Sequence, residues 1–243
     1  MKPLRKWLSR ALLALIVLLV FGWTCAAASQ WLLRYRAQKL LADIHALEVN
    51  RTTTAEAEKL LSHWAHLGEV ETGCHDGVCS HGVFSRNISP QIIQSPYTEK
   101  SLVWATSKLS DALGLRTATV SAYFTTESGV VTSKGFTEAV GLPYSDWYLR
   151  QGAYVPELII SSDESSVPRW LAEPDPLHPN RGARFRKGPY WPVIQFSPKE
   201  SASVKADLMD FHFSCMTSFF SCHNENEILP ATRTYFAKEL HLD

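Results

Sequence analysis

The chain has 243 residues, of which 45% are hydrophobic and 20% charged, and its formal net charge at pH 7 is zero. These values are ordinary for a globular protein and exclude a chain that is mostly disordered. A zero net charge provides no overall field for nucleic acid, and no helix-turn-helix, zinc-finger or RNA-binding signature occurs, so nucleic acid is excluded as a partner.

An apolar run near the N-terminus is the strongest signal in the sequence. It follows four basic residues, namely Lys2, Arg5, Lys6 and Arg10, and the first charge after it is Arg34. A run of this length, about 20 residues, crosses a hydrocarbon layer of ~30 Å as a helix. Basic residues before such a run favour a cytoplasmic N-terminus. We therefore predict a cytoplasmic segment at residues 1–10 and a transmembrane signal anchor at residues 11–33.

A cleaved signal peptide is the alternative interpretation of the same run. Ala26, Ala27 and Ala28 precede Ser29 and form a small-residue cleavage site. Apolar residues resume at once from Trp31, which favours the uncleaved, single-pass anchor. Both interpretations place the main domain outside the cytoplasm, in a periplasmic, extracellular or lumenal compartment.

Two helices are predicted directly after the anchor, over residues 34–68. Apolar residues recur there at intervals of three and four, the spacing of one helix face; they are Leu33, Ala37, Leu40, Leu41, Ile44 and Leu47. Thr53 and Glu56 then form a capping box that starts a second helix, and Gly68 ends it. The sequence thus predicts that the transmembrane helix continues into a helical hairpin.

Residues 69–243 are predicted to form the extracytoplasmic domain, of the α+β class. Short segments rich in branched and aromatic residues predict an antiparallel sheet; they lie near residues 82–88, 117–125, 130–136, 155–161, 191–196 and 204–215. Further helices are predicted at residues 98–113 and 229–240. No internal repeat or linker divides the domain.

Residues 165–192 contain six prolines, and we predict a long irregular loop there. A loop of such length is usually functional or mobile. It carries a basic run next to Tyr190 and Trp191; the basic residues are Arg181, Arg184, Arg186 and Lys187. We interpret them as a candidate site for an anionic ligand or for lipid headgroups. The alternative is a solvated loop whose aromatic side chains join the core.

Four cysteines outside the anchor form two close pairs, Cys74 with Cys79 and Cys215 with Cys222. In an oxidising compartment this pattern predicts two local disulfides. A zinc site is the alternative, since imidazoles flank both pairs; its ligands would come from Cys74, His75, Cys79, His81, Cys215, Cys222 and His223. The spacing of neither pair is that of a zinc knuckle, and free buried thiols are the third interpretation.

No catalytic motif is present, whether a Gly-x-Ser-x-Gly or Ser-x-x-Lys pattern, a metalloprotease helix or a phosphate-binding glycine loop. No catalytic residue and no cofactor is therefore assigned. The leading hypothesis is a membrane-anchored binding or envelope-interaction module whose partner is a protein, the cell wall or lipid. The second hypothesis is an envelope hydrolase with a non-standard site, and the third is a metal-binding protein that uses the cysteine and histidine residues.

Overall fold

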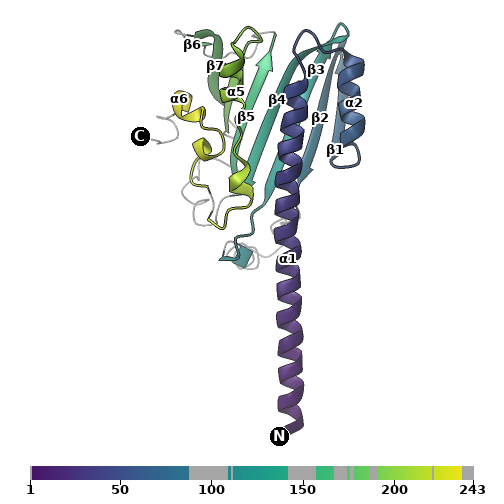
Figure 1. Cartoon of the computed structure of the whole chain (residues 1–243), viewed down its shortest axis with the longest axis vertical. Helices are drawn as coiled ribbons and strands as arrows, with labels where there is room; N and C mark the ends of the chain where they lie inside the picture. Colours follow the sequence, from purple (N-terminus) through teal and green to yellow (C-terminus); the bar gives the residue numbers. More distant parts are fainter. Residues whose placement is uncertain are drawn as a thin grey trace.

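The computed structural model describes residues 2–87, 109–110, 112–141, 157–166, 174–175, 178–186, 191–220 and 222–236. They form an α+β structure in which one long N-terminal helix lies along an eight-stranded sheet and extends far beyond its end (Figure 1). The predicted class is confirmed. Short helices follow the last strand of the sheet.

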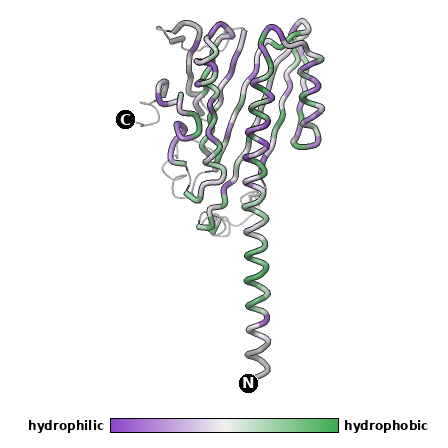
Figure 2. Tube along the Cα trace, in the orientation of Figure 1, coloured by the Kyte–Doolittle hydropathy of each residue, from purple (hydrophilic) through white to green (hydrophobic). Residues whose placement is uncertain are grey.

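Helix α1 (Lys2–Ala46) has two parts with different surroundings. The apolar first part stands clear of the rest of the chain, and Figure 2 shows it as an almost continuous hydrophobic stretch. The second part packs on the sheet through one stripe of buried side chains, namely Leu33, Ala37, Leu40, Ile44 and Leu47. The predicted stripe is therefore the core face of α1. Among the described residues, α1 is the one helix long and apolar enough to cross a membrane.

Helix α2 (Thr54–Trp64) begins at the predicted capping box, in which Thr53 and Glu56 each bond the backbone of the other. Its buried residues Ala57, Leu61 and Trp64 join the same core as α1. The indole Nε1 of Trp64 donates a hydrogen bond of 2.8 Å to the Asp43 carboxylate on α1. Helix α2 also contacts strands β2 (Val78–Arg86) and β4 (Val130–Gly141), and these contacts do not by themselves establish a helical hairpin.

The sheet has the strand order β1-β2-β3-β4-β5-β8-β7-β6. Its strands are β1 (Glu69–His75), β2 (Val78–Arg86), β3 (Ala118–Glu127), β4 (Val130–Gly141), β5 (Glu157–Ser165), β6 (Pro174–Asp175), β7 (His178–Arg186) and β8 (Trp191–Phe196). The prediction of a purely antiparallel sheet is wrong, because β5 and β8 pair in parallel. All other neighbouring pairs are antiparallel.

The strands predicted at residues 117–125 and 130–136 are confirmed as β3 and β4, which form an antiparallel hairpin. Ser128 and Gly129 both have positive φ in its turn, where glycine is favoured. Strand β1 was missed because it lies at the sheet edge with most of its side chains exposed, so it lacks an alternating apolar pattern.

The prediction of a strand at residues 204–215 is wrong. Ser201 caps helix α5 (Ala202–Leu208) by accepting a hydrogen bond from the backbone of Val204. In the segment that follows, alternate side chains are buried at Met209, Phe211, Phe213 and Cys215. That alternation produced the strand prediction, but the segment pairs with no strand and ends in the 3₁₀ helix η3 (Phe213–Met216).

The prediction of an irregular loop at residues 165–192 is also wrong for the described part of that segment. Residues 178–186 form β7, in which residues 181–186 pair with β8. After η3 come the 3₁₀ helix η4 (Glu225–Glu227) and helix α6 (Thr232–Phe236). Of the predicted helix at 98–113, residues 98–108 and 111 lie outside the described residues, as do residues 237–240 of the predicted last helix.

The core lies between one face of the sheet and the helices α1, α2 and α5 (Figure 1). Strand residues of that face include Val120, Phe124, Phe136, Val140, Leu158 and Ile160, all buried. The strands run roughly parallel to α1, so the sheet has one end near the apolar part of α1 and an opposite end near Ala46.

Candidate functional site

A cleft of about 680 Å³ opens at the end of the sheet that is remote from the apolar part of α1. Four parts of the chain form it: the end of α1 and the turn after it, neighbouring positions on β4 and β5, the turn after β8, and helix α5. Among its lining residues are His45, Arg51, Lys134, Glu164 and Lys205. The cleft is thus built from segments far apart in sequence, which only the folded sheet brings together.

Three charged side chains, two of them buried, form one group in the lining of the cleft. Lys134 on β4 and Glu164 on β5 are direct cross-strand partners, and their side chains form an ion pair of 3.3 Å. Lys205 on α5 reaches the other carboxylate oxygen of Glu164 at 2.6 Å. The side chains of Lys134 and Glu164 are only 7% and 5% exposed, so both charges have lost most of their hydration.

The ammonium group of Lys134 also bonds the chain at the end of α1. It donates to the backbone oxygens of His45, at 3.2 Å, and of Leu47, at 2.5 Å. Burial lowers the pKa of Lys134, while the charge of Glu164 acts in the opposite direction. The three hydrogen-bond donors of Lys134 are therefore satisfied within the protein, and its role is to join α1 to the sheet.

The other ionisable groups lie at the mouth of the cleft. Partial burial of the ring, and then the positive charge of Lys134, lower the pKa of His45. Arg51 pairs with Glu48 at 3.0 Å, and both side chains are well exposed. The cleft is lined by four cationic side chains, Arg51, Lys134, Lys199 and Lys205, but by two carboxylates, Glu48 and Glu164. This excess of positive charge favours an anionic ligand.

None of the charged residues in the cleft was predicted as a site from the sequence, although one pattern indicates that Lys134 is buried. Lys134 has the same strand parity as Phe136, Glu138 and Val140, all of which are buried on one face. Charged residues in register with core residues on a strand indicate a buried polar site. The partners of Lys134 could not be predicted, because they depend on the pairing of β4 with β5 and on the position of α5.

Glu138 is the second charged residue on that face of β4. It is fully buried, and neither of its carboxylate oxygens has a hydrogen-bond partner among the described residues. Burial raises the pKa of Glu138 well above its usual value, and the positive charge of Arg34 opposes the shift. A carboxyl group in such surroundings is stable in its neutral form.

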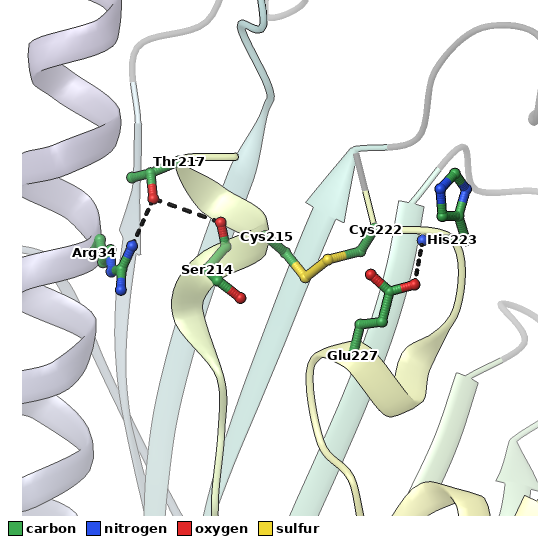
Figure 3. The surroundings of a disulfide bond; sticks show 7 residues. All are labelled: Arg34, Ser214, Cys215, Thr217, Cys222, His223 and Glu227. Atoms are coloured by element: carbon green, nitrogen blue, oxygen red, sulfur yellow. Dashed lines mark hydrogen bonds between the residues drawn. A yellow bond between two sulfur atoms is a disulfide. The ribbon is translucent and has the colours of Figure 1, made fainter. Parts of the chain in front are cut away.

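The predicted cysteine pairs both lie at disulfide distance. Cys74 and Cys79 are direct partners at the turn between β1 and β2. Cys215 and Cys222, with Cα atoms 5.4 Å apart, close a loop that begins in η3 (Figure 3). Both cysteines of this second pair are buried.

The candidate ligands of the alternative zinc site do not lie together in the structure. The first cysteine pair lies opposite Thr126, near the β3–β4 turn, whereas the second lies on the loop that Arg34 of α1 contacts through Thr217, near the other end of the sheet. His75 is exposed and pairs with Asp76, and His81 is buried and stacked on Phe124. The described residues contain no group of three or more metal-ligating side chains.

The basic run is a strand and not a loop in its described part. Arg181, Arg184 and Arg186 belong to β7, and Lys187 lies outside the described residues. The side chain of Arg181 is mostly buried and forms an ion pair of 3.2 Å with Glu200. Because Arg181 already has a carboxylate partner, the described contacts do not place it in a free anion site. A role for the run in binding anions or lipid headgroups stays a prediction.

No protein-family model, curated protein sequence or solved structure matches this chain.

Proposed function

We propose that the chain is a single-pass membrane protein whose main domain lies outside the cytoplasm. The continuity of α1 supports this: the unburied apolar part leads, without a break in the helix, into the part that forms the core of the domain. The two cysteine pairs at disulfide distance fit an oxidising compartment. The basic residues before the apolar run favour an N-terminus in the cytoplasm.

In this arrangement α1 and α2 act together as a helical hairpin that stiffens the attachment. The hydrogen bond between Trp64 and Asp43 links their facing sides, and Arg36 on α1 donates to the backbone oxygen of Leu67 just beyond α2. Their buried faces share one hydrophobic core. The domain is therefore held at a fixed height above the bilayer.

We further propose that the domain is a binding module, and that the charged cleft binds a carboxylate or phosphate group of its partner. The observation that carries this proposal is the excess of cationic side chains in a cleft of about 680 Å³. His45 lies eleven residues beyond Arg34, the first charge after the apolar run, so the cleft stands about 16 Å above that level at 1.5 Å per residue. This height suits a partner in the envelope more than a headgroup of the same bilayer.

An envelope hydrolase is less well supported by this geometry. His45 and Lys134 have lowered pKa values, as groups in active sites often do. However, the described residues that line the cleft include no serine or cysteine, which are the usual nucleophiles of acyl transfer, and Lys134 is fully engaged by Glu164 and backbone oxygens. The arrangement suits binding better than catalysis.

Calorimetric titration tests the cleft as an anion site. The full chain in neutral detergent micelles would be titrated at low salt with inorganic phosphate and, separately, with hexaglutamate, to distinguish phosphate from carboxylate recognition. We expect saturable binding of at least one probe and a loss of about tenfold in affinity for the variant Arg51→Gln/Lys199→Gln. Both residues line the mouth of the cleft.

Lys39→Gln/Lys59→Gln serves as the matched control, because Lys39 on α1 and Lys59 on α2 are exposed and outside the cleft. It removes two positive charges, as the cleft variant does, without changing the site, so its affinity should equal that of the parent. The proposal is overturned if neither probe binds saturably, or if the cleft variant and the control lose affinity equally.

A further inference from the structure

An exposed apolar patch lies beside α1, near the end of the apolar part of this helix. Its largest members are Phe219 and Phe220, 58% and 76% exposed, whose rings pack edge to face with centroids 5.5 Å apart. Leu113, 39% exposed, precedes Gly114, which Phe219 contacts, and Leu109, 57% exposed, lies one helical turn before Leu113. Two adjacent exposed phenylalanines on a folded domain indicate a contact with an apolar environment.

The position of this patch along α1 follows from three contacts. Thr217 accepts a hydrogen bond of 2.8 Å from Arg34, the first charged residue after the apolar run (Figure 3). Phe219 packs against Gly114, where an added Cβ would lie 2.7 Å from its ring. The neighbouring backbone oxygen, that of Leu113, accepts a hydrogen bond of 3.0 Å from the indole of Trp23.

The loop between Cys215 and Cys222, which carries Phe219 and Phe220, therefore runs along α1 toward the N-terminus of the helix. Arg34 and Trp23 are eleven residues apart, or about 16 Å along an α-helix. Thr217 lies at the level of Arg34, and Phe219 lies beside the segment that Trp23 contacts. Because Trp23 belongs to the apolar run, the patch reaches the depth at which the proposed anchor is within the bilayer.

The loop is also held firmly enough to keep its aromatic side chains in that position. The disulfide between Cys215 and Cys222 closes it, and both cysteines are buried. The backbone oxygen of Phe219 accepts a hydrogen bond of 3.3 Å from Arg116, whose own backbone oxygen accepts one from Gln30 on α1. The loop thus presents Phe219 and Phe220 outward while its backbone is bonded to the domain.

We propose that the loop closed by Cys215 and Cys222 inserts Phe219 and Phe220 into the outer leaflet of the bilayer, beside the anchor helix. This inference rests on the proposed membrane attachment and adds a second point of contact to it. The partner is the apolar and interfacial layer of the lipid itself, because the exposed side chains are hydrocarbon rings that favour this layer and recognise no particular headgroup. Two contacts fix the tilt of the domain, which one helix alone leaves free.

Photocrosslinking of the full chain in phosphatidylcholine nanodiscs tests the proposal. The photoreactive residue p-benzoylphenylalanine would replace Phe220, an exposed aromatic whose substitution leaves the core unchanged. Two control positions are Leu18, within the apolar part of α1, and Asp76, at the exposed β1–β2 turn near the other end of the sheet. Mass spectrometry of the irradiated protein reports whether each position carries a lipid adduct.

We expect lipid adducts at positions 18 and 220 and none at position 76. Adducts at position 18 without adducts at position 220 would overturn the loop proposal and leave the membrane anchor intact. A covalent dimer formed through position 220, in place of a lipid adduct, would show that a second copy of the chain covers the patch and would also overturn it. If position 18 fails to crosslink to lipid, the anchor itself is refuted, and the loop proposal with it.

Discussion

Glu164 connects three elements of the protein through one carboxylate. It pairs with Lys134 on the adjacent strand and with Lys205 on α5, and Lys134 in turn bonds the end of α1. Removing one partner of a buried ion pair leaves the other charge without compensation, which costs far more than loss of an exposed pair. The stability of the cleft therefore depends on Glu164.

We expect Glu164→Gln to lower the free energy of unfolding by about 3 kcal/mol, because Lys134 would stay buried without its counter-charge. Glu48→Gln is the matched control, since Glu48 lines the same cleft but pairs with Arg51 in solvent. Thermal unfolding of both variants in micelles, followed by near-ultraviolet circular dichroism, gives the comparison. Equal losses for the two variants would contradict the structural role of Glu164.

Glu138 provides a prediction of pH dependence with a definite sign. Its pKa is raised in the folded state above the usual 4.5, so above pH 4.5 the unfolded chain loses a proton that the folded chain keeps. Glu138 therefore destabilises the fold progressively as the pH rises from 4.5 toward its folded-state pKa. The variant Glu138→Gln cannot ionise and escapes this effect.

We expect Glu138→Gln to be more stable than the parent at pH 7, and to match it at pH 4. Between pH 4.5 and the folded-state pKa of Glu138, each pH unit adds about 1.4 kcal/mol to the difference in the free energy of unfolding. Denaturation of parent and variant across this pH range measures it, and Glu127→Gln, an exposed residue of β3, should show no comparable gain. A gain that is constant with pH would mean that Glu138 is ionised in the folded protein.

These residues also show the limit of reasoning from sequence alone. The stripe of α1 and the cysteine pairs could be predicted because each depends on neighbours in the chain. The cleft could not, because Lys134, Glu164 and Lys205 meet only through strand pairing and the docking of α5. A local sequence pattern indicates which residues face inward, but it does not indicate which residues they contact.

The two cysteine pairs differ in the segments that they link. Cys74 and Cys79 link two strands that already pair along seven positions, at an exposed hairpin end. Cys215 and Cys222 are buried and fix the irregular chain between η3 and η4, where no strand pairing helps. The second pair therefore contributes more to the order of its surroundings.

We expect Cys215→Ala/Cys222→Ala to lower the free energy of unfolding by about 2 kcal/mol and to loosen the loop with Phe219 and Phe220. The matched variant Cys74→Ala/Cys79→Ala removes a disulfide that closes a loop of similar length, and this loss should cost clearly less. Thermal unfolding, together with hydrogen exchange of the loop amides, measures both effects. A larger loss from the exposed pair would contradict this account.

The errors in strand prediction have one physical origin. Residues 209–215 alternate between buried and exposed side chains as a strand does, but they pair with no other strand. Strand β1 shows the opposite case, since it pairs with β2 along its whole length while its side chains are mostly polar and exposed. Side-chain alternation reports burial, whereas a strand is defined by its backbone partners, which the local sequence does not contain.

For the whole molecule, the central feature is that one helix is both the apolar segment and the core of the domain. Leu33, Ala37 and Leu40 are buried under the sheet within the same helix whose residues 11–20 are fully clear of the domain. A helix with these two environments transmits the orientation of the membrane segment to the cleft and to the loop with Phe219 and Phe220. Cleavage after Ala28 would leave the core stripe intact and abolish this coupling.

The most direct test of this account is the intact mass of a C-terminally tagged chain recovered from carbonate-washed membranes. We expect the chain to sediment with the membranes and to have a mass that includes residues 1–28. A tagged chain found in the soluble fraction, with a mass that begins at Ser29, would show that the apolar segment is a cleaved signal peptide and would contradict the account.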